Sequence, residues 1–390
     1  MAARPANAVQ FGPVGFDLNP YRDDIADRHR RLRTAESFRE PDRVPVCFAL
    51  SGSFYCAMFG VDIGEYYAEP ELQVEVQLKG LDWEYRELRA DSCTRESIGY
   101  EPGPIQEAVV FGATIERPAG TSPRIVPLCA TLDEVRALVA PPPADNPRLR
   151  AEIARAERFR RTAERLGAGV PVDVLTTMAI HPPLSCLCAI MDATAVYEAV
   201  AEEPERLRPA LEACFSAYLA YTDRWLLAAG GPPVEAVWLA DDNIASVSAD
   251  AFRALEMPFY RRIADHYRPR EFHLHTDGPN DQHFRALAGD AGVTHMDIGG
   301  FSSLAAAVRE MKGRVYLHGG LNCKDLYGPG GLTLAARRKA LDAITLAAPG
   351  GGFELAIGGE TYAGVSPQAM CDLVRLADEH GRYPIPTVPA

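Results

Sequence analysis

The sequence lacks several features that would mark whole classes of protein. No uninterrupted apolar stretch reaches the roughly 18 residues that a membrane-spanning helix needs, and no segment repeats at a fixed period. The chain also has no long basic run. Its 40 Lys and Arg and 53 Asp and Glu give a formal net charge of −13. An acidic chain is a poor partner for nucleic-acid phosphates. We therefore expect neither a membrane nor a nucleic acid as partner.

The cysteines show no framework spacing. The nine cysteines in 390 residues are scattered, which suits a reducing compartment better than secretion. The N-terminal residues lead to no apolar signal core before Asp23. These features predict a cytoplasmic protein.

Short apolar segments alternate with longer amphipathic ones along the chain, which is 47% hydrophobic. Eight segments are bounded by turn-forming residues, as buried parallel strands usually are: residues 44–50, 88–92, 170–176, 235–240, 271–275, 293–298, 314–318 and 352–357. Eight strands with intervening helices predict an α/β fold, a single (β/α)8 TIM barrel sealed by pairing of the first and last strands. A doubly wound sheet is the alternative.

The domain organisation follows from the same pattern. Residues 1–40 are predicted to form an N-terminal helical extension, and residues 41–390 the barrel. Residues 101–127 contain Gly, Pro and a short β-like stretch, so they are interpreted as an insertion between strands two and three.

Polar residues gather where the predicted strands end. In barrel enzymes the active site lies at the carboxyl-terminal ends of the strands. The candidates for catalysis are Asp91 after strand two, Asp241 and Asp242 after strand four, and His318 at the rim after strand seven. Of the two adjacent aspartates, one is expected to cap the following turn and the other to bind substrate or act as a base.

His275 and Asp277 form the sharpest pair in the sequence. Residues i and i+2 of a strand face the same side, so both side chains can reach one mouth. Imidazole and carboxylate together suit zinc or a comparable divalent ion. A hydrogen-bonded pair without metal remains the alternative, and His273 is expected to be buried beneath it.

An ordered series of motifs, spread from about residue 36 to about residue 384, resembles a known superfamily. The series comprises Glu40-Pro-Asp-Arg-Val-Pro-Val46, Ala240-Asp-Asp242, Met257-Pro-Phe-Tyr260, His275-Thr-Asp-Gly278, Gly319-Gly-Leu-Asn322 and Gly351-Gly-Phe-Glu-Leu-Ala-Ile-Gly358. It is similar to the uroporphyrinogen decarboxylases and cobalamin-dependent methyltransferases, which are single (β/α)8 barrels. The resemblance implies the same fold here.

Departures from the family pattern indicate the branch. True uroporphyrinogen decarboxylases carry an arginine-rich segment after the first strand, whereas residues 49–58 contain no arginine, and an acidic mouth would repel a polyanionic substrate. The methyltransferase branch binds zinc through His-x-Cys after strand five and a second Cys after strand eight. Asp277 and Gly359 stand near those cysteine positions, with Glu360 beside the second. The implied metal ligands are His275, Asp277 and Glu360.

The resemblance implies a corrinoid-dependent methyltransferase. A methyl group would pass from a small O-methyl or N-methyl compound, polarised by zinc, to the cobalt of a corrinoid (cobalamin) held by a partner protein, because no segment here resembles a cobalamin-binding domain. A homodimer is compatible with this interpretation. Zinc should bind more weakly as pH falls toward about 6. Two alternatives stay open: a metal-free lyase or decarboxylase with Asp91 or Asp242 as acid–base, and a non-catalytic relative that binds a small ligand.

Overall fold

Six parallel strands form the centre of the molecule in the computed structural model, which describes residues 16–91, 96–118, 120–138, 140–166, 169–172 and 177–386. The sheet order is β3-β4-β5-β6-β7-β8, so each strand pairs with its successor in sequence. The strands are β3 (Thr177–Ile180), β4 (Ala236–Ala240), β5 (Glu271–His275), β6 (His295–Ile298), β7 (Tyr316–Gly320) and β8 (Phe353–Ala356). Parallel neighbours need crossover connections, and helices supply them.

Further pairings extend this sheet on both sides. Residues of the predicted first strand form parallel bridges with the last, at Val46–Leu355 and Ala49–Glu360, which confirms the expected pairing of the first and last strands. The amide of Asp91 donates to the carbonyl of Val46. A parallel bridge between Ile98 and Val172 then joins the segments that precede β3. These contacts follow the strand order of a (β/α)8 barrel, so the predicted fold class is confirmed.

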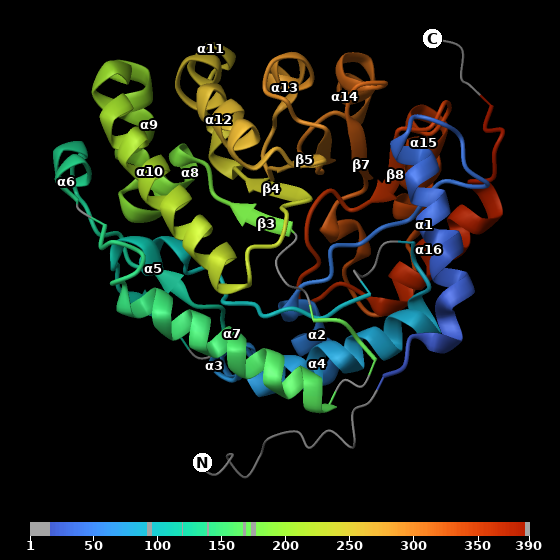
Figure 1. Ribbon diagram of the computed structural model, residues 1–390. Coiled ribbons are helices and arrows are strands. Elements are labelled where there is room, and N and C mark those ends of the chain that lie inside the picture. The colour runs from blue at the N-terminus through green and yellow to red at the C-terminus, as the bar shows by residue number, and fades with distance from the viewer. Residues whose placement is uncertain are drawn as a thin grey trace.

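Helices cover the outer side of the curved sheet (Figure 1). The longer ones are α1 (Arg22–Glu36), α4 (Pro70–Trp83), α7 (Pro147–Leu166), α9 (Ala193–Glu202), α10 (Pro204–Ala228), α12 (Met257–Tyr267), α15 (Leu334–Ala347) and α16 (Pro367–His380). The shorter ones are α2 (Gly52–Phe59), α3 (Ile63–Ala68), α5 (Gln106–Phe111), α6 (Leu132–Ala137), α8 (Pro183–Ile190), α11 (Ala249–Ala251), α13 (Phe284–Gly289) and α14 (Leu304–Met311). Single turns are η1 (Asn19–Tyr21), η2 (Glu84–Leu88), η3 (Asp242–Ser246), η4 (Phe252–Glu256), η5 (Asp281–His283) and η6 (Cys323–Leu326). Among the described residues, no helix is both long and apolar enough to cross a membrane.

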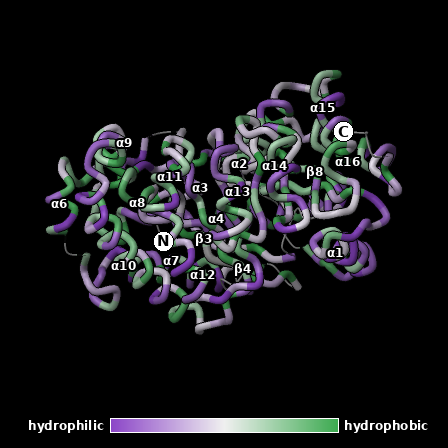
Figure 2. The backbone as a smooth tube through the Cα atoms, turned by 90° about the horizontal axis from the view of Figure 1, so that it is seen from above, coloured by the Kyte–Doolittle hydropathy of each residue, from purple (hydrophilic) through white to green (hydrophobic). Residues whose placement is uncertain are grey.

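The alternation of residue types along β4 follows from the different surroundings of its two faces. Val237 and Leu239 of β4 are fully buried and belong to the large hydrophobic core. Trp238 lies on the opposite face of the strand and stacks on His273 of β5, with ring centroids 3.7 Å apart. The helices at the periphery are more polar, and α1 is largely hydrophilic (Figure 2). The face of the sheet that lines the barrel interior is therefore aromatic and polar, while the face toward the helices is aliphatic.

The insertion before β3 is confirmed as an excursion from the barrel. Residues 101–127 contain α5 and a two-stranded antiparallel ribbon of β1 (Ile115–Glu116) and β2 (Arg124–Ile125), and helices α6 and α7 follow before β3. Helices α4 and α7 lie side by side along one flank of the molecule (Figure 1). This excursion brings α5 toward the sheet next to α8, which matters for the site below.

Three predicted strands need correction. Leu88 ends the helical turn η2 and does not begin a strand. The third strand was expected at residues 170–176, of which 173–176 lie outside the described residues, and β3 runs from Thr177 to Ile180. The seventh strand does not stop at His318 but continues to Gly320. The last two shifts move the carboxyl-terminal ends of their strands, and so change which residues reach the mouth.

Candidate metal centre and active site

The ends of β4 and β5 bring three potential ligands together. The strands are parallel and in register up to Ala240 and His275, so the residues that follow them share one edge. Asp242, His275 and Asp277 offer ligand atoms that all lie within 4.8 Å of one another. Nε2 of His275 is 3.9 Å from Oδ1 of Asp242 and 3.8 Å from Oδ1 of Asp277. One imidazole and two carboxylates form a donor set that fits zinc or another divalent cation.

The two carboxylates of this group are held close by the backbone. The amide N–H of Asp277 donates to Oδ1 of Asp242 over 2.8 Å. Burial raises the pKa of Asp277, the His275 ring opposes this, and the charge of Asp242 raises it further. Like charges at this distance repel each other unless a cation lies between them. The arrangement is therefore one that a bound divalent ion would stabilise.

Asp297, at the end of β6, orients the histidine. Its Oδ2 is 2.8 Å from Nδ1 of His275, and its Oδ1 is 3.0 Å from Nε2 of the buried His273. Burial alone would raise the pKa of Asp297, but the two imidazoles lower it. Burial would likewise lower the pKa of His275, but Asp297 raises it to about 9. A carboxylate behind a ligating histidine fixes its ring and tautomer, so Nε2 of His275 is the atom left for a metal.

Glu360 lies near this group but does not belong to it. It is exposed and supplies no atom to the cluster formed by the other three residues. Although the residue reaches solvent, partial desolvation of its carboxyl group raises its pKa, which His275 opposes and Asp277 reinforces, so it is within electrostatic reach of both. A Cβ at Gly359 would lie 3.2 Å from Cε1 of His275 and 3.4 Å from Oδ1 of Asp277. Position 359 thus borders the cluster directly, and Asp242 takes the place predicted for Glu360.

Asp241 points away from its neighbour Asp242. It is fully buried and accepts hydrogen bonds from Ser185 over 2.6 Å and from Tyr260 over 2.8 Å. It forms no side-chain cap at the start of η3, so it is not the aspartate expected to cap the turn. Burial raises the pKa of Asp241 to about 7, although the two hydroxyl donors oppose the shift. Asp241 anchors α8 and α12 to the sheet behind the metal cluster.

His318 lies inside the barrel and not at its rim. Because β7 continues to Gly320, the histidine sits two residues before the strand ends. Its Nδ1 is 2.5 Å from Oε1 of Glu354 on β8, and the Tyr316 hydroxyl donates to the other Glu354 oxygen over 3.1 Å. The His318 and His273 rings are 4.5 Å apart between centroids. The expected rim position is therefore wrong, and His318 belongs to a layer beneath the site.

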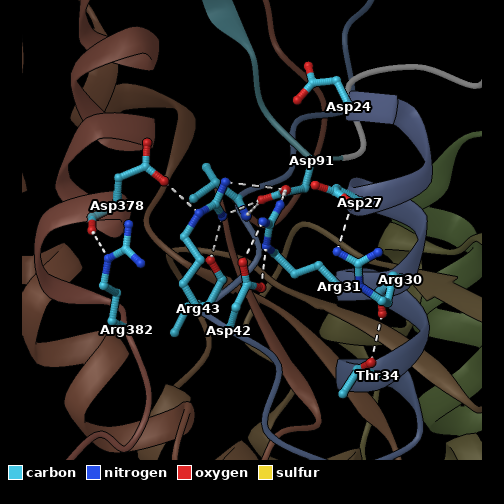
Figure 3. A network of polar contacts seen from close by, with 12 residues as sticks. Asp24, Asp27, Arg30, Arg31, Thr34, Asp42, Arg43, Asp91, Asp378 and Arg382 are labelled. Carbon is cyan, nitrogen blue, oxygen red and sulfur yellow. Dashed lines mark hydrogen bonds and ion pairs between the residues drawn. The ribbon is translucent and has the colours of Figure 1, made fainter. Parts of the chain in front are cut away.

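Asp91 lies at the opposite edge of the barrel, in the ion-pair network of Figure 3. Its carboxylate, 0% exposed, is 2.5 Å from Nη1 of both Arg31 and Arg43. Nε of Arg43 is in turn 2.6 Å from Oδ1 of Asp378, near the carboxyl-terminal end of α16. A helix that follows a strand returns antiparallel to it, so its end marks the amino-terminal edge of the sheet. The predicted position of Asp91 at the mouth is therefore wrong, since its amide donates to Val46 near the start of the predicted first strand and its carboxylate belongs to this network.

His181 was missed as a site residue. It follows β3 directly, and its Nδ1 pairs with Oε1 of Glu107, a residue of α5 that is 1% exposed. The third strand was expected to end at residue 176, five positions before this histidine. Two prolines, Pro182 and Pro183, follow His181. These prolines were the available signal that the strand continues to residue 180.

Comparison with solved structures shows what the architecture is similar to. A methyltransferase from Methanosarcina mazei aligns over 90% of this chain and 98% of its own, with 20% identity and a TM-score of 0.64. A B12-independent methionine synthase from Shewanella sp. W3-18-1 aligns over 86% and 97%, with 11% identity and a TM-score of 0.44. The first likeness shows a common fold, and the second is too distant to add to it. No curated protein matches the chain significantly.

Comparison with protein families gives a match over most of the chain. The sequence model described as uroporphyrinogen decarboxylase (URO-D) matches residues 27–380. This range includes all six strands of the sheet and every residue of the cluster around His275. The chain therefore belongs to the uroporphyrinogen decarboxylase family.

Proposed function

We propose that the protein is a methyltransferase that moves a methyl group from a small O-methyl or N-methyl compound to the cobalt of a corrinoid carried by a partner protein. The observation that carries this proposal is the group formed by Asp242, His275 and Asp277 at the catalytic edge of the barrel. The fold shared with the methyltransferase from Methanosarcina mazei supports it. Family membership alone does not select this activity, because one fold can host several chemistries.

Each residue of the cluster would hold zinc through a different ligand atom. His275 would bind through Nε2, since Asp297 occupies its Nδ1, and Asp242 and Asp277 would supply anionic oxygens. Three protein ligands leave a further position for the substrate, as catalytic zinc sites require. Zinc bound there would supply Lewis acidity that polarises the heteroatom of the methyl donor. Asp297 keeps the imidazole oriented throughout.

The chemistry of the ligands favours activation of the methyl donor. Two carboxylates and one imidazole donate less electron density than thiolates, so a metal held by them is the stronger Lewis acid. Such a metal suits an ether oxygen or an amine. A thiol substrate would be better matched by the cysteine-containing site that Asp277 and Gly359 replace here.

Exposed apolar side chains at the same edge provide a surface for the partner protein. Phe301 after β6, Tyr327 after β7 and Tyr362 after β8 are 65%, 44% and 42% exposed. Their loops adjoin, because Tyr327 pairs with Val365 and Gly300 approaches Asn322. We call Phe301, Tyr327 and Tyr362 the rim aromatics. Exposed aromatic groups next to a reaction site are typical of protein-contact surfaces.

The test measures metal and methyl transfer on the same preparations. The purified protein should contain close to one zinc per chain, and His275→Ala should lose most of it while remaining folded. With chemically reduced cob(I)alamin as acceptor, the absorbance change to methylcobalamin reports transfer from a panel of O-methyl and N-methyl compounds. His266→Ala is the matched control, since His266 is an exposed residue paired with Asp223.

Two results would contradict the proposal. Protein that binds no zinc, or that turns over substrate equally well after chelation, would favour the acid–base lyase instead. Zinc-loaded protein that transfers no methyl group from any donor in the panel would remove the methyltransferase assignment itself.

A further inference from the structure

A second imidazole stands at the mouth, on a different strand from the metal cluster. His181 is paired through Nδ1 with the buried carboxylate of Glu107, and about 30% of its side chain is exposed while Glu107 is 1% exposed. A histidine with one nitrogen held by a buried carboxylate and its other side open is the arrangement of an acid–base group. Neither residue takes part in the proposed metal site.

The strand register places His181 two strands away from His275 at the same edge of the sheet. Ile180 of β3 pairs with Leu239 of β4, and Ala240 pairs with His275 of β5. Continuing the first register by one residue sets His181 level with Ala240, and therefore with His275. Adjacent strands are about 4.8 Å apart, so the two backbones are separated by roughly 10 Å. The residue between them on β4 is Ala240, whose side chain is a single methyl group.

The electrostatic surroundings favour the protonated form of His181. Burial would lower its pKa, but Glu107 on α5 raises it, and Asp241 and Asp242 at the end of β4 raise it further. Among the described residues, Tyr218 on α10 is a further titratable neighbour, with its ring centroid 6.2 Å from that of the imidazole. The net effect is a raised pKa, which favours a ring that can donate a proton.

We propose that His181 is a catalytic residue, the proton donor to the heteroatom that is left behind when the methyl group departs, which makes the preferred donors O-methyl compounds. This inference rests on the proposed methyl transfer. The Co(I) electron pair forms the cobalt–carbon bond, and the carbon–oxygen bond breaks with its electron pair remaining on oxygen. Cobalt becomes Co(III), the oxygen takes the proton of His181, and the product is an alcohol or phenol. The neutral imidazole regains a proton from solvent.

The substrate class follows from this need for a proton. An alkoxide or simple phenoxide is a poor leaving group at neutral pH, so an ether donor gains most from an acid at this position. A quaternary ammonium donor releases a neutral amine and needs no proton. The Glu107–His181 pair would contribute nothing to that reaction, and it would therefore be unnecessary for N-methyl donors of this kind.

The experiment compares two aryl methyl ethers that differ in leaving group. Anisole releases phenoxide, whereas 4-cyanoanisole releases a stabilised phenolate that departs without a proton and carries no group that cob(I)alamin reduces. With the zinc-loaded protein and cob(I)alamin, His181→Gln should lower kcat for anisole by about 10²- to 10⁴-fold and leave kcat for 4-cyanoanisole within about threefold of wild type. Zinc content should not change, and His266→Gln should behave as wild type on both ethers.

Glu107→Gln tests the same inference while keeping the imidazole. It should lower the pKa of His181, so that the alkaline limb of the anisole profile and the NMR titration of the His181 ring both move to lower pH. Equal losses of kcat on both ethers, or an unchanged profile in Glu107→Gln, would overturn the role of His181 but leave methyl transfer intact. Absence of any transfer by wild-type protein would overturn the proposed function and this inference together.

Discussion

His275 is subject to two opposing demands. Asp297 raises the pKa of its imidazole to about 9, against the effect of burial, and so favours the protonated ring when no metal is bound. A metal needs the neutral ring, because the proton and the ion compete for Nε2. Asp297, which orients the His275 ring, therefore also raises the pH below which protons compete with the metal, compared with an ordinary histidine.

We expect zinc binding to release about one proton per chain at pH 7.5. Apparent zinc affinity should fall about tenfold for each pH unit below about 9, so the weakening begins well above the pH of about 6 inferred from the sequence. Calorimetry in buffers of different ionisation enthalpy measures the proton count. Binding that is independent of pH between 7 and 9 would contradict the raised pKa of His275.

The raised pKa of His275 can also be tested in the metal-free protein, where protonation of the ring stabilises the fold. Since the folded pKa of His275 is raised, its contribution to stability is fully present below about 6.5 and is lost as pH rises through about 9. The free energy of unfolding of chelated wild type should therefore decline over this window relative to His275→Gln.

Asp297→Asn should weaken zinc binding by about 10- to 100-fold, the usual cost of losing a carboxylate behind a ligating histidine. The amide retains the size of the side chain but removes the charge that both His273 and His275 contact. Competition with a chromophoric chelator measures the change. Asp290→Asn is the control, because that carboxylate is 63% exposed, and equal effects of the two substitutions would contradict the role of Asp297.

The sequence could predict the pair His275 and Asp277, because two residues on one face of a strand meet whatever surrounds them. It could not predict that Asp242 would complete the group in place of Glu360. That outcome depends on the register of β4 and β5 and on the hydrogen bond from the Asp277 amide. The contacts of Asp297 and Glu107 could not be predicted for the same reason, since their partners are tertiary neighbours.

At the scale of elements, two glycines are the reason that the carboxyl-terminal end of β7 was predicted too early. Gly319-Gly320 looked like a turn, but both residues belong to the strand. A Cβ at Gly319 would lie 2.5 Å from the carbonyl oxygen of Ile298 on β6, so glycine is required there by the close approach of two strands. β4 and β5, which contain no glycine, were predicted to within one residue.

The network around Asp91 joins α1, the segment before the first strand and α16 (Figure 3). Asp91→Ala would leave Arg31 and Arg43 without their shared buried partner, and breaking such a pair costs about 3–5 kcal/mol. We expect a matching loss in the free energy of unfolding, measured with urea, and unchanged zinc content.

Asp27→Ala is the control for the stability loss expected in Asp91→Ala. Its ion pair with Arg30 is exposed, at 56% and 69% of the two side chains, so its loss should cost less than about 1 kcal/mol. A loss of zinc in Asp91→Ala while the fold persists would mean that Asp91 is coupled to the site, contrary to its place at the opposite edge.

At the scale of the whole molecule, function and stability are separated between the two edges of the barrel. The proposed metal ligands follow the carboxyl-terminal ends of strands, as do His181 and the loops bearing the rim aromatics, and the arginine–aspartate network closes the other edge. This is the usual division in barrel enzymes. In the proposed function, a protein-bound corrinoid would therefore approach over the loops after β6, β7 and β8, where the rim aromatics are exposed.

Phe301→Glu should lower kcat/KM for a corrinoid protein by about tenfold or more, because a buried aromatic contact at an interface is commonly worth about 2 kcal/mol. Its rate with free cob(I)alamin should not change, since the small acceptor needs no docking surface. Leu227→Glu is the matched control: Leu227 is 67% exposed against 65% for Phe301, and it lies near the end of α10, at the edge of the barrel away from the mouth. Equal loss in the two variants, or equal loss with both acceptors, would show that the rim aromatics do not receive the partner.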